Sequence, residues 1–291
     1  MKQRVGLIGV GLMGHGIASN IARKGWPLGY LRHPGNQPTD DLDAAGATGW
    51  DTAAELARNS DFLVLCVTGS PQVEDVLAGS GQVLDALNPG TVIIDCSTAN
   101  PTSTLAMAEK VAAKGAHFVD AAMTRTPKEA AEGRLNLLVG GEPEIVAKAR
   151  PLLEAFSENI FLAGGVSTGH QLKLLHNFVS LGTATLISEA VACAGNGGVS
   201  MDALVDCLAK GGGAGVALDR LRPFIAEGET AQFRFSIANA AKDLQYYRTM
   251  ATDLNAARRV ADSVGDTLDG LVSGGHGEEL MPEQINLLRK Q

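Results

Sequence analysis

The glycine-rich stretch GVGLMG is the feature that most restricts what this chain can fold into. It spans residues 9–14, after the apolar run VGLIG and before small or apolar residues at helical spacing. Glycines at positions 9, 11 and 14 permit a tight turn and let a pyrophosphate approach the N–H groups of a helix N-terminus. The stretch therefore predicts a dinucleotide-binding strand–turn–helix unit formed by Gly9, Gly11, Leu12, Met13 and Gly14.

Short apolar runs through the first half of the chain predict buried strands. They cover residues 4–10, 27–32, 61–68, 90–97, 117–123, 135–141 and 159–165, with helical stretches between them. Because these runs lack polar alternation, they indicate a largely parallel sheet that is covered on both faces. We expect an α/β protein with a Rossmann-like, doubly wound domain over residues 1–163.

The second half, residues 164–291, is predicted to be an all-α domain. No proline occurs between Pro151 and Pro223, so one long helix is expected from Ser167 to about Gly195, joining the two domains. The GGGAG at residues 211–215 indicates either a helix break or a flexible linker. The C-terminal PEQINLLRKQ indicates either an amphipathic helix or a frayed tail.

Composition and charge exclude several classes of function. A net charge of −8 argues against a general binder of nucleic acid or of membrane surfaces. The N-terminal apolar run is too short for a signal peptide, and no stretch approaches the roughly 20 apolar residues that span a bilayer. The 4 cysteines show no CxxC spacing and the 6 histidines form no ligand cluster. These features predict a cytoplasmic protein with reduced thiols and no metal.

The choice of cofactor depends on the end of the second expected strand. An NAD site usually places an acid there, about 20 residues after the glycines, to accept from the ribose 2′-OH. Here the strand ends GYLRHPGN, with no acid before Asp40, and Arg32 stands in that region. A guanidinium suits a 2′-phosphate, so NADP is expected rather than NAD. The alternative is that Arg32 is a solvated loop arginine.

Polar residues share one face of the expected long helix. Gly169, Lys173, His176, Asn177 and Ser180 recur at spacings of three or four. The apolar neighbours would partly bury Lys173, and desolvation lowers the pKa of a lysine towards the range of proton exchange near neutrality. From spacing alone, a helix-surface lysine beside a capping asparagine stays an open alternative.

Four ordered motifs make the chain similar to the β-hydroxyacid dehydrogenase family. GLIGVGLMGHGIASNIARKG resembles the opening GxGxMGxxMAxNL, with Ile17 where methionine is usual. DCSTANP resembles DxSTxxP, GHQLKLLHN resembles GxxxKxxNN, and AAKDL matches a late KDL element. The resemblance covers nearly the whole chain and implies a Rossmann-like domain, a helical domain joined by the long helix, and a homodimer or homotetramer.

The resemblance also implies roles for single residues. Lys173 would be the catalytic acid and base, and Asn177 would orient the reacting oxygen. His176 stands where most of the family has asparagine. The 6-phosphogluconate dehydrogenases of this family have histidine at this position, and His176 would add a hydrogen bond to the substrate. Ser97 would lie near the substrate. The cofactor would contact Val67, Thr68, Thr98 and Lys242.

One segment departs from the family. Where the family commonly reads DAPVSGG, this chain reads DAAMTRT, so Thr124, Arg125 and Thr126 replace a Ser-Gly-Gly grip on the substrate carboxylate. We expect Arg125 to bind a carboxylate, sulfonate or phosphate of the substrate through paired N–H donors. A structural salt bridge, for instance with Glu129 or Glu132, or a rearranged loop, is the alternative.

The sequence as a whole predicts an NAD(P)-dependent oxidoreductase, with NADP preferred. It would transfer hydride between nicotinamide and a small anionic 3- or 4-hydroxy acid or semialdehyde. A rival is a sulfonate reductase of the sulfolactaldehyde type, whose relatives carry a comparable arginine. A rival from another class is a non-catalytic sensor that binds NADP. Lys173, Asn177 and Lys242 together argue against the sensor, because binding alone needs no proton-transfer group.

Overall fold

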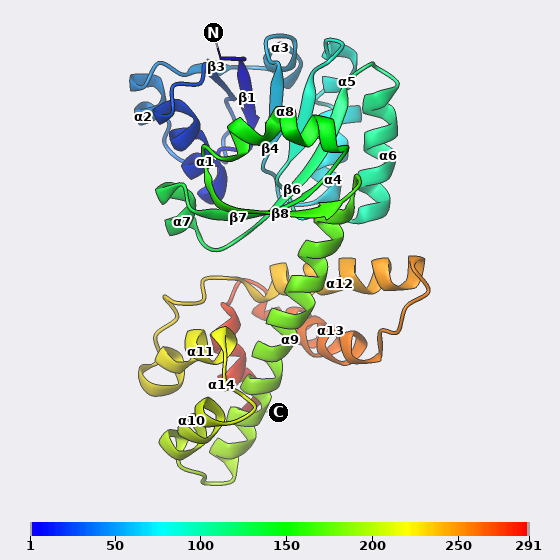
Figure 1. The fold of residues 1–291 in the computed structure, drawn as a ribbon. Helices are drawn as coiled ribbons and strands as arrows, with labels where there is room; N and C mark the ends of the chain where they lie inside the picture. Colours follow the sequence, from blue (N-terminus) through cyan, green and yellow to red (C-terminus); the bar gives the residue numbers. More distant parts are fainter. Residues whose placement is uncertain (1, 290–291) are drawn as a thin grey trace. The chain divides into compact units, whose positions relative to one another are not determined.

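The chain folds into two compact units, seen in a computed structural model that describes residues 2–289. One unit ends at Lys173 and the other begins at Leu174. The first is a sheet with helices on both faces and the second is helical (Figure 1), so the predicted fold class is confirmed. The units meet inside helix α9 (Thr168–Asn196), whereas the boundary predicted between residues 163 and 164 falls at the end of the last strand.

The sheet of the first unit has the strand order β3-β2-β1-β4-β5-β6-β7-β8. Its strands are β1 Val5–Ile8, β2 Leu28–Leu31, β3 Thr48–Trp50, β4 Phe62–Leu65, β5 Val92–Asp95, β6 His117–Thr124, β7 Leu135–Gly140 and β8 Ser157–Gly164. Neighbouring strands are parallel except β6 and β7, which are antiparallel. Every predicted strand is present. The sequence did not predict β3, because its residues TGW form no apolar run at an edge of the sheet.

Successive strand residues fill two separate hydrophobic cores, one on each face of the sheet. Phe62 and Val64 of β4 pack into one core, and Leu63 and Leu65 into the other. The first face is covered by α1 Leu12–Arg23, α2 Asp40–Ala44, α7 Pro127–Glu132 and α8 Pro143–Leu153. The second is covered by α3 Ala53–Arg58, α4 Ser70–Ala78, α5 Val83–Ala86 and α6 Pro101–Ala112. Burial on both faces explains why the strand sequences show no polar alternation.

Helix α9 matches the single long helix that the proline-free segment predicts. Among residues 2–289 it alone is long and apolar enough to cross a membrane by length and composition, with a mean hydropathy of 1.4. A core helix passes the same test, and Leu174, Leu181 and Ile187 are buried in the core of the helical unit. Packing therefore accounts for part of its apolar composition, since 44% of the apolar window is buried.

Short helices complete the second unit. They are α10 Met201–Lys210, α11 Val216–Glu227, α12 Ile237–Asp253, α13 Arg259–Leu271, the π-helical turn η1 Val272–His276, the 3₁₀ turn η2 Met281–Glu283 and α14 Gln284–Arg289. The GGGAG at 211–215 separates α10 from α11, so it breaks a helix. The C-terminal segment forms η2 and α14, and residues 290 and 291 lie outside the described part of the chain.

Candidate active site

Four loops of the first unit leave the sheet at one edge, because β1, β4, β5 and β6 are parallel. The chain order reverses between β1 and β4, and open α/β sheets bind ligands at the carboxyl edge beside such a reversal. These loops carry most of the residues predicted for cofactor and substrate. They supply Gly9 to Gly14 after β1, Val67 and Thr68 after β4, Ser97 and Thr98 after β5, and Arg125 and Thr126 after Thr124 ends β6.

Two of the three glycines in the turn stand where no other residue fits. Gly9 has φ +99°, and a Cβ there would collide with the carbonyl oxygen of Cys66. A Cβ on Gly14 would collide with the carbonyl oxygen of Gly9, whereas a Cβ on Gly11 would meet no atom within 4 Å. No side chain caps the start of α1 and its first turn holds no acid. These features fit a pyrophosphate at the helix N-terminus, with Gly11 on the open approach.

Ser97 ties two of these loops together. Its buried hydroxyl accepts a hydrogen bond from the N–H of Val67 at 3.1 Å, and its own N–H donates to Asp95 Oδ1 at 2.9 Å. Thr98 is partly exposed and Thr68 is exposed. The loops after β4 and β5 are thus held as one unit, with both threonines accessible beside it.

Arg32 has a carboxylate partner on the neighbouring strand. Its Nη1 lies 3.0 Å from Oδ1 of Asp51, which follows β3, and both side chains are mostly exposed. The guanidinium lies over Gly49, where an added Cβ would stand 2.7 Å from Arg32 Nε. Sequence reasoning missed Asp51 as a partner because it depends on the pairing of β3 with β2.

Lys173 lies near the start of α9 and is buried, with a relative exposure of 9%. This confirms the burial that its apolar neighbours predict. The first turn of α9 is anchored on β6, because the Asp120 carboxylate accepts from the N–H groups of Ser167 at 2.7 Å and His170 at 2.8 Å. Burial raises the pKa of Asp120, against the opposing effects of His170 and the two N–H donors. Lys173 and Asn177 lie one turn apart on the same helix.

A buried carboxylate organises the polar group of the helical unit. Asp243 Oδ2 accepts from Asn177 Nδ2 at 2.6 Å, and Asp243 Oδ1 lies 3.2 Å from Lys242 Nζ. His176 Nδ1 lies 2.9 Å from Asn177 Oδ1. The structure therefore brings together three residues that the sequence assigned to the site. Sequence reasoning missed Asp243, although it is the aspartate of the AAKDL motif.

Arg125 adopts a backbone conformation that favours glycine. Its φ is +84°, at the position where the family commonly has a glycine. The guanidinium donates to the carbonyl oxygen of Arg134, just before β7, and pairs with the carboxylate of Glu158 in β8. Since β6 lies between β5 and β7, this side chain extends away from the Ser97 loop.

The acids expected as alternative partners of Arg125 are engaged elsewhere. Glu129 accepts from the N–H and hydroxyl of Thr126, forming the capping box of α7. Glu132 lies 3.3 Å from Arg134 Nε. The salt bridge that the sequence left open therefore exists, but its acid is Glu158. Sequence reasoning missed it because β8 reaches Arg125 only through its pairing with β7.

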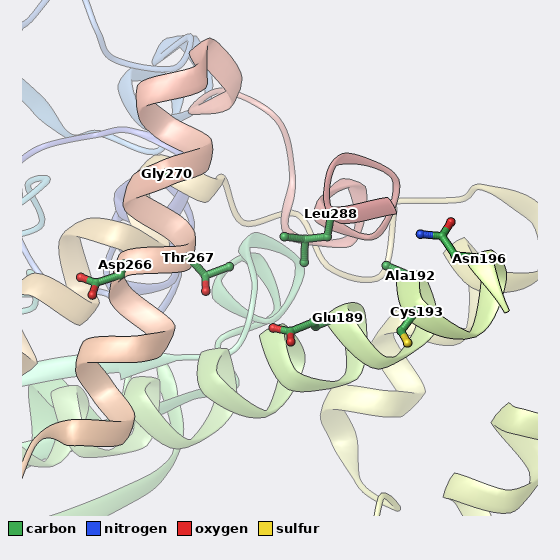
Figure 2. A pocket seen from close by; sticks show the side chains of 8 residues that line it. All are labelled: Glu189, Ala192, Cys193, Asn196, Asp266, Thr267, Gly270 and Leu288. Atoms are coloured by element: carbon green, nitrogen blue, oxygen red, sulfur yellow. The ribbon is translucent and has the colours of Figure 1, made fainter. Parts of the chain in front are cut away.

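A cavity of about 490 Å³ lies within the helical unit, away from the motifs (Figure 2). Residues of α9, α13 and α14 line it, and Figure 2 shows Glu189 and Asp266 among them. No residue that the sequence assigned to the site takes part. Two carboxylates at its wall make it unsuited to an anionic substrate.

The cysteines lie in different environments: Cys96 is buried, Cys66 is partly buried, and Cys193 and Cys207 are exposed. All 4 cysteines are free thiols, and burial raises the pKa of Cys66 to about 12, so this thiol is protonated at neutral pH. Within residues 2–289 no group of three or more histidines, cysteines or acids could hold a metal ion.

Family models match both halves of the chain. Residues 4–165 match the NAD binding domain of 6-phosphogluconate dehydrogenase. Residues 167–288 match the NAD-binding domain of NADP-dependent 3-hydroxyisobutyrate dehydrogenase. The chain belongs to the β-hydroxyacid dehydrogenase family. It is an NAD(P)-dependent oxidoreductase of the hydroxyacid dehydrogenase type.

Several known oxidoreductases are similar to this chain. The 2-hydroxy-3-oxopropionate reductase of Escherichia coli is 32% identical over 195 residues, 67% of this chain and 66% of that one. The 3-sulfolactaldehyde reductase of Escherichia coli is 32% identical over 186 residues, 64% of this chain and 62% of that one. The solved 3-hydroxyisobutyrate dehydrogenase of Mycobacterium tuberculosis with L-serine has a TM-score of 0.88 at 23% identity, covering 99% of this chain and 100% of that one, which shows a shared fold.

Proposed function

We propose that this β-hydroxyacid dehydrogenase uses NADP to interconvert a small anionic 3- or 4-hydroxy acid and its aldehyde, with Lys173 as the proton donor and acceptor. The burial of Lys173 one helical turn before Asn177 carries this proposal. Burying an ammonium group is unfavourable, so a buried lysine among site motifs is a candidate for proton transfer. A protein that only binds a dinucleotide would gain nothing from it.

The chemistry needs one hydride and one proton. When bound, the nicotinamide exchanges hydride with the carbonyl carbon of the substrate. In the reductive direction the Lys173 ammonium gives a proton to the carbonyl oxygen and becomes a neutral amine. In the oxidative direction the neutral amine takes the hydroxyl proton. Asp243 fixes the amide of Asn177 so that its remaining N–H can donate to the reacting oxygen.

The substrate class is tested by a panel of carbonyl compounds. Semialdehydes with a carboxylate, an aldehyde with a sulfonate, and neutral aldehydes of the same length are assayed with NADPH and NADH separately. We expect turnover of anionic aldehydes and weak turnover of neutral ones. Preference for the sulfonate would favour a reductase of the sulfolactaldehyde type. The 3-sulfolactaldehyde reductase of Escherichia coli is 32% identical to this chain over 186 residues. Tight cofactor binding with no turnover of any compound would favour the sensor.

Arg32 is proposed to bind the 2′-phosphate of NADP. Its pair with Asp51 at 3.0 Å is exposed, so a phosphate can compete for the guanidinium. Arg32→Ala should raise KM for NADPH by about tenfold or more and leave KM for NADH nearly unchanged. Asp51→Asn, the matched variant, should lower KM for NADPH. A wild-type preference for NADH of more than about tenfold, roughly 1.4 kcal/mol, would contradict this role.

Arg125 is proposed to bind the substrate anion together with Thr124, Thr126, Ser97 and His176. Because Arg125 pairs with Glu158, the anion must draw the guanidinium away from that carboxylate. Arg125→Gly suits the backbone φ of +84°, so the loop should keep its shape. We expect this variant to raise KM for the anionic substrate by about tenfold while kcat changes less.

Glu158→Gln is the matched variant for this prediction. It removes the competing carboxylate charge while leaving Arg125 and its bond to the Arg134 carbonyl in place, so KM for the anionic substrate should fall. Steady-state kinetics of both variants decide the matter. If neither variant changes KM, Arg125 has only a structural role, through its contacts with Glu158 and the carbonyl oxygen of Arg134.

The proposal includes a homodimer or homotetramer in the cytoplasm. Val179 and Leu186 of α9 are 65% and 60% exposed, and a second copy could cover them. Four free thiols suit a reducing compartment. Light scattering should give a multiple of the 30.2 kDa chain mass, and a monomer would contradict the oligomer.

A further inference from the structure

His170 lies in the first turn of α9 and is completely buried, with a relative exposure of 0%. Its Nδ1 lies 2.7 Å from the hydroxyl oxygen of Thr104 in α6. Its Nε2 faces Oδ2 of Asp95, at the end of β5, at 3.9 Å. Its backbone N–H donates to Asp120 of β6 at 2.8 Å. His170, at the start of α9, thus contacts α6, β5 and β6.

The two aspartates lie at matching places in the sheet. Asp95 and Asp120 are register partners on β5 and β6. Each precedes a loop of the candidate site: Asp95 accepts from the N–H of Ser97 at 2.9 Å, and Thr124 ends the strand that holds Asp120. Lys173 follows His170 by three residues on the helix. His170 therefore contacts Asp95, which holds the Ser97 loop, and Asp120, whose strand leads to the Arg125 loop. It also lies on the helix that carries Lys173.

The two polar atoms that face each other between His170 and Asp95 have no other polar partner among the described residues. Among the described residues, His170 Nε2 and Asp95 Oδ2 are buried and make no hydrogen bond. Leaving a buried polar atom without a hydrogen bond destabilises the fold, so packing alone would favour an apolar residue here. The single proton of the Thr104 hydroxyl has two acceptors in reach, His170 Nδ1 at 2.7 Å and the Asn100 carbonyl oxygen at 3.1 Å. When it is donated to Nδ1, the shorter contact, the ring proton sits on Nε2 and points towards Asp95. The contact then attracts the helix start to the end of β5.

We propose that His170 is a positioning residue for proton transfer. It holds the first turn of α9 against the ends of β5 and β6, and so fixes Lys173 relative to the Ser97 loop. This role rests on the proposed function, because it acts through Lys173. A small shift of a reacting group is enough to slow a reaction greatly while binding is preserved.

Two substitutions separate the two nitrogens of the ring. In His170→Asn the amide stands near the place of Nδ1, so it keeps the contact with Thr104 and loses the group that faces Asp95. In His170→Gln the amide reaches towards Asp95. We expect His170→Asn to lower kcat by about tenfold or more with KM values for substrate and NADPH nearly unchanged, and His170→Gln to recover much of the loss.

Ser60→Ala is the control for a simple loss of stability. The Ser60 hydroxyl is buried and donates to the carbonyl oxygen of Leu56 at 2.7 Å, just before β4 and hence at the other end of the strands. It should lower Tm without lowering kcat. Kinetics are measured where circular dichroism shows each variant folded. Should His170→Asn fail to fold, Thr104→Val removes only the hydroxyl that orients the ring and is expected to lower kcat in the same way.

The outcomes separate this inference from the proposed function. A kcat within about twofold of wild type in the folded variant, or a loss confined to KM, would leave His170 a purely structural residue. Equal losses in His170→Asn and His170→Gln would exclude the contact with Asp95 as the cause. If Lys173→Ala keeps normal turnover, both the proposed function and this role fail. If it abolishes turnover while His170→Asn is normal, the positioning role alone fails.

Discussion

Lys173→Ala is expected to lower kcat by about 10²- to 10⁴-fold, the range that a general acid or base contributes. Lys173 is buried and is the only lysine of α9, so this helix offers no second amine to take its place. NADPH binding should stay nearly intact, because the glycine turn lies after β1. The measurements are single-turnover rates and NADPH titration by fluorescence.

Lys210→Ala is the matched control for removing a lysine. Lys210 is exposed and pairs with Asp206 one helical turn away at 2.8 Å. Exposed pairs of this kind contribute little to stability, so turnover should not change. Near-normal turnover in Lys173→Ala would end the assignment of the acid and base.

Gly11→Ala is expected to raise the Kd for NADPH by about tenfold or more while Tm stays close to wild type. The protein leaves open space around this position, with no atom within 4 Å of an added Cβ. The new methyl would instead stand where a pyrophosphate approaches the start of α1. Calorimetric titration and thermal unfolding measure the two effects separately.

Gly14→Ala should behave in the opposite way. Its Cβ would collide with the carbonyl oxygen of Gly9 inside the turn, so we expect a loss of stability of about 1–3 kcal/mol or more, as for other overpacked sites. Gly212→Ala, also in open space but far along the chain in the helical unit, controls for the general effect of replacing glycine. Normal NADPH binding by Gly11→Ala would show that the turn does not hold the pyrophosphate.

Much of the fold could be predicted because local patterns carry it. Strands such as residues 62–65 are buried on both faces and therefore form unbroken apolar runs, and the helix from Thr168 to Asn196 contains no proline. The edge strand β3 has only the residues TGW, in which the pattern is too short to recognise. A local pattern of apolar residues identifies helices and strands, but it does not identify a strand that is short and half-exposed.

The partners of the site residues could not be predicted in the same way. Arg32 and Arg125 were both singled out as anion receptors, yet the carboxylates that they contact come from β3 and β8. These contacts depend on strand pairing, which links residues far apart in sequence. His170 gave no signal of its own, because its surroundings arise only when Asp95 and Asp120 come into register.

The continuity of α9 has a practical consequence for protein engineering. The compact units meet between Lys173 and Leu174, inside one uninterrupted helix. A chimaera joined at that point would combine Lys173 from one parent with Asn177 from another, and a fragment cut there would end in a severed helix. Exchange of catalytic halves between relatives should therefore join the chains before Thr168, so that the whole helix comes from one parent.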